Sequence, residues 1–164
     1  MLLTDSPGPS MTQSRSFLDQ SGTEVRRFHK EVLLNGVVDS VVDYDPGFTR
    51  FDEAWATVQA GTVDTRMYTR TEVPPASGTG IDMRVQQYTI EDTNVDITVP
   101  AGSFSGCLRL LRARQGPDGG PPASNQISEK RFTFCPGVGK VQEDDLTGGD
   151  LEVLVSCTVP GGNC

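Results

Sequence analysis

The sequence predicts an all-β protein with a single antiparallel, strongly curved sheet, either half-barrel or sandwich-like, cross-linked by disulfide bonds. The chain has 164 residues, and its 17 Val and 16 Thr against 7 Ala favour strands over helices. Its 18 Gly and 11 Pro supply turn residues. Short β-branched segments separated by turn signals recur from Arg15 onward, with no intervening helical patterns. We expect one β-domain over residues 15–164, after a disordered segment, 1–14, that is polar and rich in Pro and Gly.

The first hairpin is predicted where Asn35-Gly36 separates Val32-Leu33-Leu34 from Val37-Val38. Asn-Gly between two apolar β-formers favours a tight turn, because both turn residues must adopt positive φ. A helix over 23–34 is the alternative, since apolar residues also recur there at helical spacing and Gly36 could end it.

The later strands are short segments between turn signals. They are expected at 53–60, 62–73, 83–91, 94–99, 103–114, 129–135, 138–143 and 151–159. Loops are expected at 45–47, 74–82 and 115–128, and a final turn at 146–150.

The four cysteines are Cys107, Cys135, Cys157 and Cys164. An even number without a CxxC pair favours two disulfides and an oxidising compartment. Reduced buried thiols are one alternative and a four-thiolate zinc site is another. Zinc ligands usually come as two close pairs, whereas 27, 21 and 6 residues separate these cysteines.

A hairpin around the 115–128 loop selects one pairing of these cysteines. A register centred near residue 121 sets Cys107 opposite Cys135. The same register sets Leu108 opposite Phe134 and Leu110 opposite Phe132, and a slip of one residue would break this apolar face. Cys157 and Cys164 then remain for a second disulfide across the intervening Pro-Gly-Gly turn.

Two segments, VPAGSFSGCLRL at 99–110 and FCPGVGKV at 134–141, carry a family resemblance. The motif pair resembles a group of poorly characterised bacterial exported or lipoprotein-type β-sheet proteins. The resemblance implies an extracytoplasmic antiparallel β-domain, such as the half-barrel of the lipoprotein carrier proteins, and it implies no catalytic residues. Independently, Pro100 is expected to end a ladder, and Gly102 and Gly137 to permit tight bends.

The compartment expected is extracytoplasmic: periplasm, cell envelope or secreted. The start Met1-Leu2-Leu3 leads into polar residues and is too short for a signal peptide, so we expect a removed leader or a misassigned start. A cytosolic protein with reduced cysteines is the alternative. No apolar run approaches the ~20 residues of a membrane-spanning helix. The net charge of −8 argues against nucleic acid as a partner.

Candidate chemical groups are few. His29 is expected to be a half-exposed strand residue without a nucleophile. Asp43-Tyr44-Asp45-Pro46-Gly47 lacks the downstream Glu of a calcium loop. A solvated acidic turn is expected at Glu143, Asp144, Asp145 and Asp150. A basic stripe that forms interstrand ion pairs is expected at Arg109, Arg112 and Arg114.

These observations predict a non-enzymatic domain of the bacterial cell envelope, with no metal and no cofactor. One hypothesis is a concave sheet that binds a lipid or another apolar ligand. The alternative is a structural or protein-interaction module with a closed core, whose partner would be an envelope protein. The ligand-binding residues are not predicted.

Overall fold

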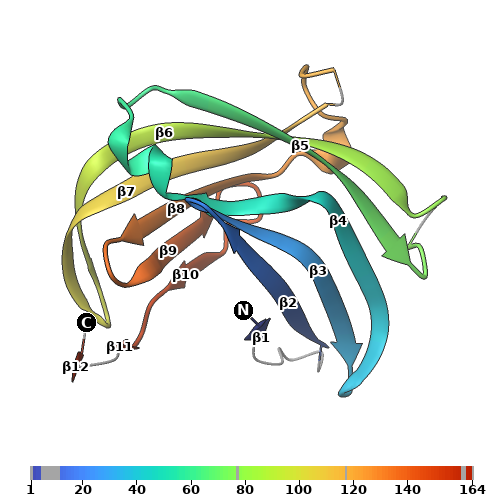
Figure 1. Cartoon of the computed structure of the whole chain (residues 1–164), viewed down its shortest axis with the longest axis horizontal. Helices are drawn as coiled ribbons and strands as arrows, with labels where there is room; N and C mark the ends of the chain where they lie inside the picture. Colours follow the sequence, from blue (N-terminus) through green and yellow to red (C-terminus); the bar gives the residue numbers. More distant parts are fainter. Residues whose placement is uncertain (1, 5–11, 77, 117, 160–161, 164) are drawn as a thin grey trace. The chain divides into compact units, whose positions relative to one another are not determined.

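A computed structural model describes residues 2–4, 12–76, 78–116, 118–159 and 162–163. Ten strands form one sheet, and neighbours in the sheet follow the order of the chain from β1 to β10 (Figure 1). The strands are β1 (Leu2–Thr4), β2 (Thr12–Ser21), β3 (Glu24–Leu34), β4 (Val37–Asp52), β5 (Val63–Val73), β6 (Ile81–Val99), β7 (Gly102–Gln115), β8 (Glu129–Cys135), β9 (Gly139–Asp145) and β10 (Leu151–Val153). A separate ladder pairs β11 (Thr158–Val159) with β12 (Gly162–Asn163). Two 3-10 turns are η1 (Glu53–Thr57) and η2 (Ser124–Gln126).

The predicted fold class is confirmed. The protein is all-β, and one antiparallel sheet curls instead of dividing into the two facing sheets of a sandwich. Bulges interrupt the β2–β3, β3–β4, β6–β7 and β8–β9 ladders. A bulge bends its strand and increases the local twist, which accounts for bends such as that of β4 in Figure 1.

The contacts divide the sheet into two compact units. Unit 1 comprises Met1–Glu53 and Arg66–Arg84, and unit 2 comprises Ala54–Thr65 and Val85–Cys164, each taken over its described residues. Strands β2 to β4 belong to unit 1, and β7 to β10 belong to unit 2.

The first hairpin forms as predicted, and residues 24–34 are strand β3 instead of a helix. Asn35 and Gly36 have φ values of 52° and 81°, so both turn residues occupy the left-handed region. Glycine adopts this region without strain and Asn tolerates it better than other residues, which explains why this dipeptide fixes the turn.

The segment 53–60 differs from its prediction as a strand, because Glu53–Thr57 forms the 3-10 turn η1. The turn buries Trp55, whose ring lies 4.7 Å from that of Tyr88. The Trp55 indole Nε1 donates a hydrogen bond to Asp64 at 2.8 Å. Burying this large side chain with its polar atom satisfied outweighs the strand preference of the local sequence.

Four further boundaries differ from the predictions. The loop expected at 45–47 lies within strand β4, which continues to Asp52. The expected strands 83–91 and 94–99 are one strand, β6, interrupted by bulges. The expected strand 151–159 is shorter, because β10 ends at Val153 and the Leu154 carbonyl accepts a hydrogen bond from Ala101 of the β6–β7 turn. Within 1–14, where disorder was expected, residues 2–4 and 12–14 lie in strands because β1 pairs with β2 and β2 with β3. The remainder of 1–14 lies outside the described residues.

The sheet of unit 2 has two faces of different character. One face, here called the packed face, carries large apolar residues that are at most 4% exposed: Tyr88, Ile90, Leu108, Leu110 and Phe132. The opposite face, here called the groove face, carries two rows of cross-strand neighbours. The first row is Asp92, Arg109, Thr133, Gln142 and Val153, and the second is Thr89, Leu111, Arg131, Asp144 and Leu151.

Candidate functional site

The disulfide between Cys107 and Cys135 is present, with the two Cα atoms 4.3 Å apart. The predicted register of β7 and β8 is confirmed, because Leu108 pairs with Phe134 and Leu110 with Phe132. The disulfide lies in a small core at one end of the groove face, with Val95 and Val141 buried and Leu154 packed against it. Cys157 is also disulfide-bonded. Its predicted partner, Cys164, lies outside the described residues.

The centre of the groove face is a depression of about 630 Å³, here called the charged groove. Its lining residues are Gly61, Thr89, Ile90, Glu91, Asp92, Arg109, Arg131, Gln142 and Asp144. The lining comes from β6, β7, β8 and β9 and from the turn after η1. Thr133, the cross-strand neighbour of Arg109 on the groove face, is buried. This mixture of charges on a half-exposed surface suits polar contacts better than an apolar ligand.

The two arginines of the charged groove have different surroundings. Arg131 donates two hydrogen bonds to Glu91, at 2.8 and 3.1 Å, and these raise the pKa of its guanidinium. Asp144 lies 3.9 Å away on the other side of Arg131. Within the described part of the chain, the side chain of Arg109 makes no hydrogen bond or ion pair, although Asp92 is its cross-strand neighbour.

The predicted arginine stripe is divided between the two faces. Side chains alternate along a strand, so Arg109 belongs to the groove face while Arg112 and Arg114 belong to the packed face. The guanidinium of Arg112 lies 4.8 Å from the centre of the Phe132 ring, a cation–π contact. The expectation of ion pairing along one stripe is therefore wrong for Arg109.

The groove face ends at an apolar edge formed by residues 151–155, here called the β10 edge. Leu151, Val153 and Val155 are 60%, 36% and 71% exposed. Leu151 and Val153 continue the two rows of the charged groove, so apolar and charged groups adjoin on one surface. The register places Val153 on the face opposite to that of Leu108 and Phe132.

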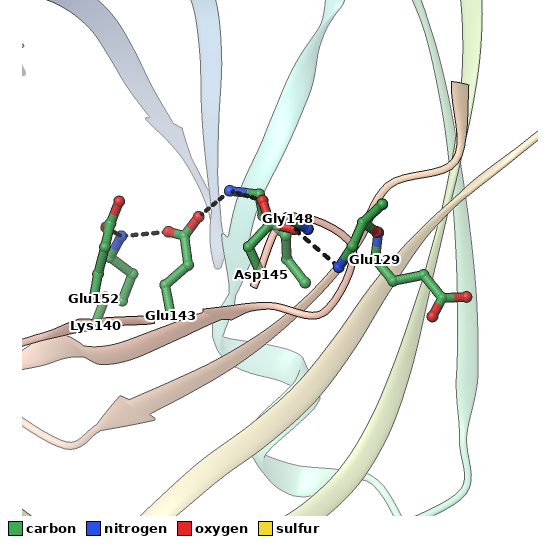
Figure 2. A network of polar contacts seen from close by, with 8 residues as sticks. Glu129, Lys140, Glu143, Asp145, Gly148 and Glu152 are labelled. Atoms are coloured by element: carbon green, nitrogen blue, oxygen red, sulfur yellow. Dashed lines mark hydrogen bonds and ion pairs between the residues drawn. The ribbon is translucent and has the colours of Figure 1, made fainter. Parts of the chain in front are cut away.

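On the packed face, β8, β9 and β10 carry a ladder of alternating charges (Figure 2). Lys130 Nζ lies 3.1 Å from Asp145 and 2.8 Å from Glu143. Lys140 Nζ lies 2.5 Å from Glu143 and 3.2 Å from Glu152. Burial works to raise the pKa of Glu143, but the two ammonium groups outweigh it and lower this pKa to about 2.

The acidic group expected at the last turn is thus not uniformly solvated. Glu143 is buried between two lysines, whereas Asp145 organises the turn by accepting hydrogen bonds from the backbone N–H groups of Thr147 and Gly148 (Figure 2). These bonds, with Lys130, lower the pKa of Asp145. Within the described residues, no cluster of three or more His, Cys, Asp or Glu side chains is arranged to hold a metal ion.

In unit 1, His29 is a partly exposed residue of β3, as predicted. Its Nδ1 lies 2.6 Å from the Asp43 carboxylate, and its ring meets that of Phe17 edge to face. Asp43, the first residue of the acidic segment 43–47, is a residue of strand β4. A His–Asp pair orients an imidazole, but a hydrolytic site also requires a hydroxyl or thiol nucleophile. Among the described contacts of His29, neither neighbour is such a group.

Sequence reasoning missed a buried ionic network in unit 1. Arg26 hydrogen-bonds to Glu24, Thr49 donates to Glu24 at 2.5 Å, and Arg66 bridges Glu24 and Asp52. Burial works to raise the pKa of Glu24, but Arg26 and Thr49 hold it below its usual value. The partners come from strands β3, β4 and β5 and are up to 42 residues apart in the sequence, so only the register brings them together.

An aromatic cluster in unit 1 was also missed. The rings of Tyr44, Phe48 and Tyr68 lie within 6.0 Å of one another, centre to centre. The guanidinium of Arg27 lies 5.9 Å from both the Tyr44 and the Phe48 ring. Phe48 and Tyr68 are buried, whereas Tyr44 is partly exposed.

These features define a class: an all-β protein of one antiparallel sheet, with a buried disulfide and a charged groove that continues into an apolar edge strand. No family model, no curated protein and no solved structure matches this chain. Of what the motif resemblance implied, the curled antiparallel sheet is therefore the part that is confirmed. Among the described residues, no helix has the length and apolar character needed to span a membrane.

Proposed function

We propose that this chain is a non-enzymatic, extracytoplasmic β-domain of the bacterial cell envelope that acts by contact with another protein. One observation carries the proposal: the apolar residues of the packed face are buried, whereas the exposed apolar residues of β10 adjoin the charged groove. A surface that combines apolar side chains with charged neighbours is typical of protein interfaces. The buried packed face gives a ligand little apolar surface to occupy.

The extracytoplasmic location is supported by the cysteines. Cys107, Cys135 and Cys157 are all disulfide-bonded. Disulfides persist in the periplasm and outside the cell and are rare in the reducing cytosol. The resemblance of the two Pro-Gly motifs to exported bacterial proteins agrees with this location.

The non-enzymatic character is supported by the surroundings of the reactive side chains. Cys107 and Cys135 are bonded to each other in a disulfide, so neither is a free thiol. His29 contacts Asp43 and Phe17. A nucleophile, a base and an orienting group within hydrogen-bond reach define a hydrolytic site, and the described contacts assemble no such set.

The test is photo-cross-linking of the exported protein in the envelope of a bacterial host. A photoreactive amino acid replaces Asp92 in the charged groove or Val153 in β10, and the exposed Gln59 serves as the control position. We expect a discrete protein adduct from at least one groove-face position and none from Gln59. Equal labelling at all three positions, or no adduct at either groove-face position, would contradict contact with a protein.

A second candidate function is the binding of a lipid or another apolar ligand. The aromatic cluster of unit 1 supports it, because Tyr44 leaves one aromatic ring partly open to solvent. This candidate predicts stoichiometric uptake of a fatty-acid probe, whereas protein contact through the groove face predicts none.

A further inference from the structure

Within the described residues, the backbone groups on the outer side of β10 pair with no other strand. Asp145 N–H donates to the Asp150 carbonyl, and Leu154 N–H donates to the Val141 carbonyl. The even-numbered residues of this segment therefore direct their backbone groups toward β9, and the alternation of an antiparallel ladder turns those of Leu151 and Val153 outward. Among the described residues, β9 is the only strand that pairs with β10.

The side chains of this edge form a simple pattern. Leu151 and Val153 are exposed on the groove face, whereas Glu152 lies on the opposite side of the strand with its side chain 69% exposed. An added strand would set its own side chains beside these three, about 5 Å away. The complementary pattern in such a strand is apolar, basic, apolar.

Charge disfavours a second copy of this chain at the same edge. In the antiparallel register that gives both Leu151 and Val153 backbone hydrogen bonds, Leu151 of each copy pairs with Val153 of the other copy. The two Glu152 side chains would then lie directly opposite each other, and like charges directly opposite are destabilising. Asp144, the cross-strand neighbour of Leu151, and Asp150, which precedes Leu151 in the chain, add negative charge, and the whole chain carries −8.

We propose that the β10 edge receives an extended segment of another protein by strand addition, and that this segment alternates apolar and basic residues. Backbone hydrogen bonds to Leu151 and Val153 supply affinity, and a Lys or Arg opposite Glu152 supplies selectivity. This inference rests on the proposed function, because it names the partner of the same surface.

The test uses the full chain and short blocked peptides with a Val-Lys-Val core. We expect saturable binding by fluorescence anisotropy and slowed hydrogen exchange of the Leu151 and Val153 amides. A Val-Glu-Val peptide is expected to bind about fivefold more weakly, the scale of one cross-strand charge pair. Glu152→Lys should reverse this preference, which a structural role for Glu152 would not do.

Two controls separate strand addition from nonspecific binding. Val153→Pro removes an outward N–H without breaking the β9 ladder, so it should abolish binding, while Val153→Thr should retain it. If the proline variant does not fold, a peptide N-methylated at its bonding amides carries the same test on the unaltered chain. Binding that survives N-methylation, or no saturable binding of the Val-Lys-Val peptide, would overturn strand addition.

Two further outcomes separate this inference from the proposed function. A dimer that forms with increasing concentration and is lost in Val153→Pro would identify a second copy as the occupant and overturn the basic partner. Cross-linked adducts at Asp92 without peptide binding would also overturn strand addition, but protein contact through the groove face would stand.

Discussion

Glu143 occupies a position where a carboxylate is stable only with cations beside it. Its side chain is 11% exposed, and Lys130 and Lys140 each place an ammonium group within hydrogen-bond distance. The sequence indicates an acidic group near the last turn, but it does not indicate these partners. They depend on the β8–β9 register, in which Lys130 is set opposite Asp145, two residues from Glu143.

The stability of the protein should therefore depend on pH through Glu143. Its pKa falls from 4.5 to about 2 on folding. The charged form is favoured in the folded state, so this stabilisation is complete above pH 4.5 and is lost as the pH falls toward 2. The shift corresponds to about 3 kcal/mol. Glu143→Gln should lower the free energy of unfolding by about 2–3 kcal/mol at pH 7 and flatten its dependence on pH below 4.5.

Urea unfolding between pH 2 and pH 7 measures this effect. Glu152→Gln is the matched control, because Glu152 contacts the same Lys140 but is exposed, and we expect a change within about 0.5 kcal/mol. Equal losses in the two variants would mean that burial does not strengthen the Glu143 contacts.

At the scale of elements, the β7–β8 hairpin is the part that the sequence predicts best. Its register follows from three coincident pairs, Cys107–Cys135, Leu108–Phe134 and Leu110–Phe132, and a slip of one residue would lose all of them. The sequence does not predict in this way which face of the sheet carries the apolar residues of β10. A bulge in the β8–β9 ladder between Thr133 and Phe134 shifts the register, and it contributes to placing Val153 on the groove face.

The Cys107–Cys135 disulfide should contribute substantially to stability. The two cysteines are 28 residues apart in the chain, and closing a loop of that size in the unfolded state corresponds to about 3–4 kcal/mol. We expect the double variant Cys107→Ala, Cys135→Ala to lose about this much in urea unfolding. The paired replacement keeps the site apolar and leaves no unpaired thiol. A loss below about 1 kcal/mol would show that the β7–β8 pairing alone constrains this loop.

At the scale of the whole molecule, composition and turn signals predict the all-β class, because Val and Thr dominate over Ala and no helical periodicity competes. They do not predict η1, since the burial of Trp55 against Tyr88 is a tertiary effect that overrides local preference. They also do not predict where apolar surface stays exposed. That depends on the registers, which bury Ile90 and Leu110 in unit 2 and leave Leu151 and Val153 exposed.

The central claim is that this chain acts through its groove face and holds no apolar ligand. Titration of the full, disulfide-bonded chain, purified without detergent, with a fluorescent fatty-acid analogue tests it most directly. We predict no saturable binding, because Tyr88, Ile90, Leu110 and Phe132 already bury one another on the packed face. Saturable binding of one probe per chain would contradict the claim and favour a lipid-binding function.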